Sequence, residues 1–183
     1  MQTQKILDND SQRVWRFDPA YTTVEFTVKK LFLFKVKGSF SDIQGSIVLD
    51  EQDIKRSSVV ASISAESVKT GNASRDQSLR SKGFLDVSTY PLIEFESVQV
   101  GPGQDRDTLD VTGVLKVKGQ PREVKLIVNE VDRSKAPSGE EFVYYSATTR
   151  LDRFVLGIKG MPGVIGKLLD VTINVQALSS SEE

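Results

Sequence analysis

Apolar and polar residues alternate along most of this chain, which is the pattern of β-strands with one buried face. The clearest run covers residues 109–117, where every second residue is apolar or glycine. Further runs lie at residues 15–17, 24–28, 36–40, 43–49, 59–65, 93–95, 124–128 and 171–177, and residues 141–151 are apolar on both parities. Many strands joined by short loops predict antiparallel pairing, and either a closed barrel or a two-sheet sandwich would bury the apolar faces.

The alternation changes at two places. Its parity shifts between Phe95 and Val98, which predicts either a β-bulge near Ser97 or a strand that is buried on both faces. Four consecutive apolar residues at 31–34 break it altogether. We expect residues 31–34 to form a bend that packs into the core, and the alternative is an exposed patch that binds a partner.

One link between strands predicts a hairpin. Ser41 and Asp42 are turn-forming residues, and they separate the apolar runs at residues 36–40 and 43–49. We therefore expect these two runs to pair with each other.

A short helix is predicted at residues 72–83. Asn72 can cap its first turn by accepting a hydrogen bond from a free backbone N–H group, and Gly83 can end it in the left-handed conformation. Leu79 is the one large apolar residue between them, and so short a helix does not hold by itself in water. We expect it to lie against the β-structure and to close one end of it as a lid.

Glycine recurs every third residue from Gly157 to Gly166. The backbone N–H groups of such a loop can cradle a phosphate, but the Gly-Lys-Ser/Thr ending and the strand-to-helix frame of a nucleotide loop are missing. We interpret this segment as a rim loop with apolar contacts through Ile158, Met161 and Ile165, and with a role at an entrance.

Length and charge narrow the class of protein. The 183 residues suit one domain over 1–183, with flexible ends at 1–12 and 179–183. The net charge is −1, from 24 basic and 25 acidic residues, which argues against a nucleic-acid surface and a polybasic membrane anchor.

No apolar run in the sequence is long enough to span a membrane. The first ten residues lack the apolar centre of a signal peptide, so we expect a soluble cytoplasmic protein, or a periplasmic one if a leader preceded this sequence.

The chain contains no histidine and no cysteine. This removes the most common general base, the most reactive nucleophile and most ligands for transition metals. We therefore expect no metal site and no catalytic residues. An enzyme that uses a carboxylate or a tyrosine remains the less favoured alternative.

Several ordered motifs carry a resemblance to a known family. The central set is Thr70-Gly71-Asn72, Arg75-Asp76, Leu79-Arg80-Ser81, Phe84, Asp86 and Tyr90-Pro91-x-Ile93-x-Phe95-x-Ser97, and the outer set includes Trp15-x-Phe17-Asp18, Val24-x-Phe26-x-Val28, Gly38-x-Phe40, Gly113-x-Leu115-x-Val117-Lys118-Gly119 and Asp152-Arg153-Phe154. Together they resemble the YceI family, bacterial lipocalin-like barrels that are associated with polyisoprenoid binding.

This resemblance implies a fold and a function. The fold is an all-β, antiparallel lipocalin-like barrel of about eight strands with a short helix closing one end. The function is non-catalytic binding and carriage of a long apolar or amphiphilic molecule, such as a prenyl lipid or an isoprenoid quinone, with no other cofactor; a homodimer stays open. The inward-facing residues that we expect to contact the ligand are Phe26, Val28, Ile47, Ile63, Phe95, Leu115, Leu126 and Val128.

Charged residues are expected at the polar end of the barrel. They are Arg75, Asp76, Arg80 and Arg153. The first three could order a polar headgroup, or could pair with each other and with Arg153 or Asp152. We favour the structural role for Arg75 and Asp76. The competing function is a barrel without a pocket that acts through protein–protein contacts, with residues 31–34 exposed.

Two departures from the resemblance concern metals. Many relatives carry histidine where this chain has Lys30 and Ser78. We therefore predict no zinc or nickel affinity and no group that titrates near pH ~6.5. Calorimetry checks this, and tight stoichiometric zinc binding would contradict it.

Overall fold

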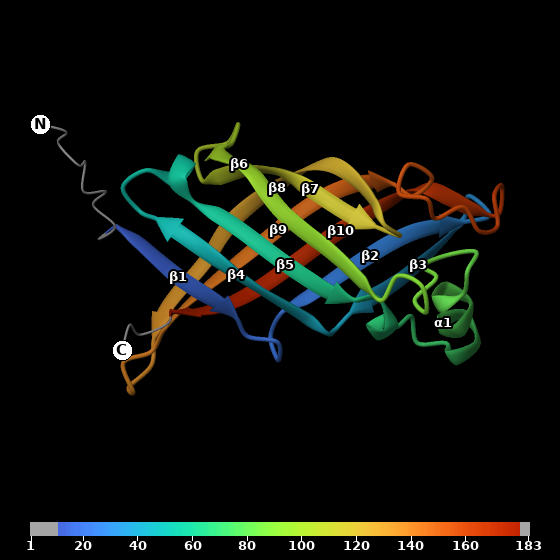
Figure 1. Cartoon of the computed structure of the whole chain (residues 1–183), viewed down its shortest axis with the longest axis horizontal. Helices are drawn as coiled ribbons and strands as arrows, with labels where there is room; N and C mark the ends of the chain where they lie inside the picture. Colours follow the sequence, from blue (N-terminus) through green and yellow to red (C-terminus); the bar gives the residue numbers. More distant parts are fainter. Residues whose placement is uncertain (1–10, 180–183) are drawn as a thin grey trace, which may run out of the picture.

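The computed structural model describes residues 11–179, and these residues form strands, one α-helix and two short 3₁₀-helices (Figure 1). The strands are β1 (Gln12–Phe17), β2 (Thr23–Lys30), β3 (Phe34–Phe40), β4 (Ile43–Asp50), β5 (Ser58–Ser64), β6 (Leu92–Pro102), β7 (Thr108–Val117), β8 (Gln120–Lys135), β9 (Glu141–Asp152) and β10 (Ile165–Ser179). The helices are η1 (Ile54–Arg56), η2 (Ala65–Ser67) and α1 (Ala73–Arg80).

The strands close into an antiparallel barrel in the order β1-β4-β5-β6-β7-β8-β9-β10, and β10 pairs back with β1. Strands β1 and β2 both pair with β10. Strand β1 pairs with the C-terminal end of β10 and β2 with its N-terminal part, so β2 continues the line of β1. In the same way β3 pairs with β2, and β4 pairs with β1. The molecule is therefore an eight-stranded barrel whose first two strands are each broken in two. The predicted fold class is confirmed.

The prediction of a hairpin between β3 and β4 is wrong. Strand β3 pairs with β2, whereas β4 pairs with β1 and β5. Ser41 and Asp42 therefore connect two segments that run in the same direction, and the local turn signal marks a break in one long strand. The pairing partner lies far away in the sequence, where a local pattern does not reach.

The prediction that residues 31–34 pack into the core is also wrong. They form the tip of the β2–β3 hairpin, which extends past the end of β5, so β3 is an edge strand there. The side chains of Leu31, Phe32, Leu33 and Phe34 are 49%, 85%, 82% and 60% exposed. The break in alternation marks a turn that leaves the barrel.

The β-bulge predicted near Ser97 is confirmed. The register between β6 and β7 shifts between Ser97 and Gln99, so that Val98 points to solvent and Val100 into the barrel. The extra residue changes the inward parity of β6.

The short helix is confirmed in place, and its predicted end is wrong. The Asn72 side chain accepts a hydrogen bond from the backbone N–H of Arg75 at 2.9 Å, as expected of a cap. The helix ends at Arg80, with Ser81 as the capping residue. Gly83 lies beyond this end and does not adopt a positive φ, because the turn at Ser81 has already closed the helix.

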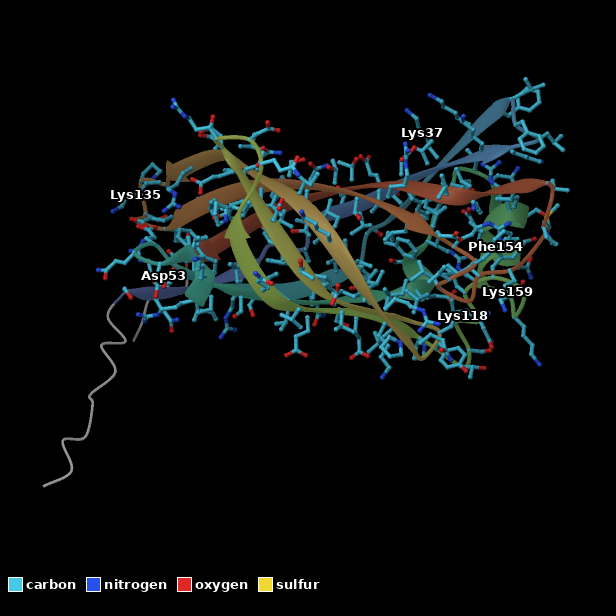
Figure 2. All side chains as sticks on the ribbon, turned by 90° about the horizontal axis from the view of Figure 1, so that it is seen from above. Lys37, Asp53, Lys118, Lys135, Phe154 and Lys159 are labelled. Atoms are coloured by element: carbon cyan, nitrogen blue, oxygen red, sulfur yellow. The ribbon has the colours of Figure 1, made fainter. Side chains whose placement is uncertain are left out.

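One end of the barrel contains fully buried side chains. At the end opposite α1, Trp15, Val143 and Ala177 are fully buried, and Figure 2 shows Asp53 and Lys135 at that end.

Gln12 and Ser179, which belong to the predicted flexible ends, pair with Asp50 and Trp15, respectively. The ranges 1–10 and 180–183 of those ends lie outside the described residues. Within residues 11–179, no helix combines the length and the apolar character needed to cross a membrane.

Candidate ligand-binding cavity

The barrel encloses a cavity of about 620 Å³. Its walls are inward-facing side chains from every strand of the ring, and most of them are apolar. The residues named from the sequence all line it, namely Phe26, Val28, Ile47, Ile63, Phe95, Leu115, Leu126 and Val128. Contact of these residues with a ligand stays a prediction.

Glycines shape two parts of the wall. Gly38 lies directly opposite Phe26 on the neighbouring strand, and a Cβ at this position would overlap the Phe26 ring. A Cβ on Gly113 would overlap the Phe95 ring in the same way. The missing side chains let both rings lie against the wall, which leaves the centre of the barrel open.

The cavity opens at the end that carries α1. Five of the six exposed lining residues in the described chain lie there, and we call them the cavity mouth: Lys30, Asn72, Ser74, Ser78 and Met161. The sixth, Ser58, lies at the start of β5 near the opposite end. They come from β2, from α1 and its cap, and from the loop between β9 and β10. Lys30 and Ser78, the two positions of the histidine departures, therefore face the same cavity.

Two charged residues of α1 hold the lid in place through Thr70. The Asp76 carboxylate accepts hydrogen bonds from the Thr70 backbone N–H at 2.8 Å and its hydroxyl at 2.6 Å. The Arg75 guanidinium donates to the Thr70 hydroxyl at 2.7 Å and to its carbonyl at 2.8 Å. Arg75 and Asp76 therefore meet at Thr70 and pair neither with each other nor with Arg153 or Asp152. Arg75 also lines the cavity.

Arg80 fixes the other end of α1. Its guanidinium donates to the carbonyls of Glu66 at 2.9 Å and Val68 at 3.0 Å, and it forms an ion pair with the Glu66 carboxylate at 3.3 Å. It does not line the cavity. Its contacts tie the helix to η2 and give it no access to a headgroup inside the barrel.

Arg153 organises the loop between β9 and β10. It is 2% exposed, and its guanidinium donates to the carbonyls of Ile158, Gly160, Ile165 and Gly166 at 2.8–2.9 Å. Burial lowers the pKa of this guanidinium from its ordinary value, and the charge of Asp152 opposes the shift. Because the loop carbonyls converge on a cation, this glycine-rich segment is built around Arg153 and not around a phosphate.

No carboxylate lines the cavity among residues 11–179. Its titratable residues are Lys30, Arg75, Tyr145 and Arg153. The Tyr145 hydroxyl donates to the Glu130 carboxylate at 3.2 Å. Burial, together with the Glu130 charge, raises the pKa of this phenol, which keeps it neutral and makes it a poor base. The part of the chain that the structure describes also holds no cluster of acidic residues that could bind a metal ion.

The sequence pattern missed much of the mouth. Lys30 shares the inward parity of Phe26 and Val28, which could have placed it in the wall, but a lysine at the end of a strand is usually solvated. Asn72 and Ser74 have no comparable signal, because their place depends on how α1 docks. Met161 belongs to the predicted rim loop, and it lines the cavity.

Comparisons with known proteins agree with this architecture. The family model described as the YceI-like domain matches residues 15–177. A UPF0312 protein of Pseudomonas putida is 32% identical over 155 residues, which cover 85% of this chain and 80% of the relative. A UPF0312 protein of Vibrio cholerae is 29% identical over 162 residues, or 87% of this chain and 82% of the relative.

Solved structures share the fold. BcnA of Burkholderia cenocepacia superposes with a TM-score of 0.76 at 18% identity, covering 90% of this chain and 99% of BcnA. The YCEI protein of Campylobacter jejuni gives 0.72 at 22% identity, with coverage of 99% and 100%. A polyisoprenoid binding domain from Saccharophagus degradans gives 0.66 at 15% identity, with coverage of 91% and 98%. Because the family model matches nearly the whole barrel, this chain belongs to the YceI-like family.

Proposed function

We propose that this protein binds and carries a long apolar or amphiphilic molecule, such as a prenyl lipid or an isoprenoid quinone, without acting on it chemically. The observation that carries the proposal is the apolar cavity of about 620 Å³ inside the barrel. Ligand pockets in proteins have volumes of about 300–1,000 Å³ and mostly apolar walls. A barrel built to be solid would fill this space with side chains.

Transfer of the ligand out of water would supply the affinity. Each buried methylene contributes about 0.8 kcal/mol, so a chain of about 20 carbons contributes about 16 kcal/mol. Association costs about 4–15 kcal/mol. The net gain for such a chain is therefore about 1–12 kcal/mol, and it falls as the chain becomes shorter, so the cavity favours long apolar chains over short ones.

The cavity mouth favours a ligand with a polar or anionic head. Lys30 and Arg75 are cationic, and Ser74, Ser78 and Asn72 offer hydroxyl and amide groups beside them. The apolar tail would lie in the barrel and the head would stay at the mouth, because burial of an unpaired polar group in an apolar site is costly. A relative of the same fold is described as a polyisoprenoid binding domain, which supports this ligand class.

Two alternatives have less support. An enzyme would need an activated base or nucleophile inside the cavity. Among the described lining residues the titratable groups are three cations and one neutral phenol, and no histidine or carboxylate lines the cavity to activate its serine and threonine hydroxyls. A barrel without a pocket is at odds with the cavity. The exposure of residues 31–34, which that alternative also expected, is compatible with a carrier that also has a docking surface.

Native mass spectrometry tests the proposal. We expect the purified full chain to carry a non-covalent adduct of one molecule per barrel, because a long apolar chain leaves such a cavity slowly. Organic extraction should return an apolar-chain lipid. If the protein carries no adduct, and the delipidated protein also fails to take up a fluorescent prenyl probe, the proposal is wrong.

A further inference from the structure

The β2–β3 hairpin ends in four adjacent apolar residues that the described part of the chain leaves largely exposed. We call Leu31, Phe32, Leu33 and Phe34 the hairpin tip; their exposed fractions lie between 49% and 85%. Figure 2 shows the hairpin standing out from the barrel at the end that also carries Phe154 and Lys159. Single exposed apolar residues are ordinary, but a contiguous group marks a surface that binds something.

Folding alone does not explain these residue types. Leu31 and Phe32 have φ values of 50° and 61°, and the Leu33 N–H donates to the Lys30 carbonyl at 3.2 Å to close the turn. Such turns favour Asn-Gly, because bulky side chains strain a backbone with positive φ. Leucine and phenylalanine here cost conformational energy, and about half of the Leu31 side chain and most of the Phe32 side chain stay exposed.

Lysines flank the tip on both strands. Lys29 lies directly opposite Lys35, and Lys37 follows on the same outer face. None of the three forms an ion pair with the described residues. Like charges opposite each other destabilise a strand pair. Lysine on an edge strand can prevent aggregation. This role does not account for the hairpin, because its exposed apolar tip would itself promote aggregation.

We propose that the hairpin tip inserts into the interface of an anionic phospholipid bilayer. Its apolar side chains would enter the boundary between headgroups and acyl chains, while the lysines behind them meet the anionic headgroups. Charge complementarity favours a bilayer over another protein, because within residues 11–179 these lysines have no acidic partner. The net charge of −1 averages over the whole molecule and does not reflect this local excess of positive charge.

Docking by the hairpin would bring the cavity to the membrane surface. Lys30 and Val36 belong to the hairpin and line the cavity. The Leu31 N–H also donates to the Val164 carbonyl at 2.8 Å, which joins the tip to the loop between β9 and β10. An apolar ligand could then pass between bilayer and barrel with little exposure to water. This last step rests on the proposed function, whereas the docking itself does not.

Vesicle co-sedimentation of the full chain tests the docking. We expect the protein to sediment with vesicles of phosphatidylcholine and phosphatidylglycerol, and much less with phosphatidylcholine alone. The double variant Phe32→Ser/Leu33→Ser should lower the partition coefficient at least about tenfold, because it removes the two most exposed apolar side chains of the tip. Val98→Ser/Val131→Ser is the matched control, since these side chains are 62% and 65% exposed away from the tip, and it should partition like the wild type.

Two further variants separate the contributions of insertion and charge. Phe32→Trp should shift its fluorescence to shorter wavelength when anionic vesicles are added, whereas Trp15 is fully buried and should not respond. Lys29→Gln/Lys35→Gln/Lys37→Gln should remove the preference for phosphatidylglycerol and the sensitivity to salt, because surface charge attraction is screened by ions.

Three outcomes would overturn the proposal. The first is a wild type that does not bind anionic vesicles. The second is binding that the Phe32→Ser/Leu33→Ser variant leaves unchanged. The third is a dimer of the wild type that this variant dissociates, since the tip would then join two copies. Lipid extracts of the Phe32→Ser/Leu33→Ser variant separate membrane docking from the carrier function. If the variant keeps its ligand but no longer binds vesicles, both proposals are supported. If neither the wild type nor the variant ever carries a ligand, only the carrier function is refuted.

Discussion

Leu115→Arg will leave the barrel folded and lower its content of apolar ligand at least about tenfold, which corresponds to about 1.4 kcal/mol of binding free energy. Leu115 lines the cavity and belongs to β7 near its Val117 end. In a solid core an unpaired charge would unfold so small a domain. In this barrel the long side chain can extend through the lumen toward the mouth, where water reaches it.

Val114→Arg provides the matched control for this prediction. Val114 is the preceding residue of β7, and its side chain is exposed on the outer face. The control variant should keep both its fold and its ligand. The measurements are circular dichroism and quantitative lipid extraction of both proteins. Unchanged lipid in a well-folded Leu115→Arg protein would remove Leu115 from the binding surface, and outright unfolding would favour a solid core.

Arg153→Met will destabilise the protein by about 3 kcal/mol or more, because it leaves four carbonyls without their donor and each buried unpaired group costs about 1–3 kcal/mol. The variant no longer buries a charge, and water near the mouth can reach part of the loop, so the loss stays below the sum of the four. For a domain of this size we expect the melting temperature to fall by about 6–12 °C.

Two further variants make this prediction specific. Arg150→Met removes a guanidinium three residues earlier, in β9, where it pairs with Asp170 on the surface, and exposed pairs contribute only about 0–1 kcal/mol. Arg153→Lys keeps the charge but loses the planar array of donors, so its melting temperature should lie between the wild type and Arg153→Met. Equal melting temperatures for Arg153→Met and Arg150→Met would show that Arg153 does not hold the loop.

The local pattern predicted many of the apolar strand residues that line the cavity. Alternation places every second side chain of a strand on the same face, so Leu115 and Leu126 could be assigned inward before their neighbours were known. The parity shift after Phe95 located a bulge that the register between β6 and β7 contains. The cap at Asn72 was equally readable, because a capping hydrogen bond spans only a few residues.

Other parts of the site depend on contacts between distant segments. Arg153 could be singled out by resemblance, but its role follows from four carbonyls that the loop folds toward it. Likewise, Asp76 and Arg75 meet through Thr70 only because the chain before α1 turns back on the helix. Side-chain geometry of this kind has no signature in residue spacing.

The hydrophobic pattern indicates which side chains leave water, and it does not say what replaces the water. Phe26 and Phe32 are equally apolar in the sequence, yet Phe26 lies against Gly38 in the cavity wall and Phe32 is 85% exposed at a hairpin tip. The same holds for Ser41 and Asp42, whose turn signal became a break in a strand because β3 and β4 found different partners. Strand pairing, the open barrel and the exposed tip are decided by contacts across the whole chain, because each depends on where the far ends of the strands meet.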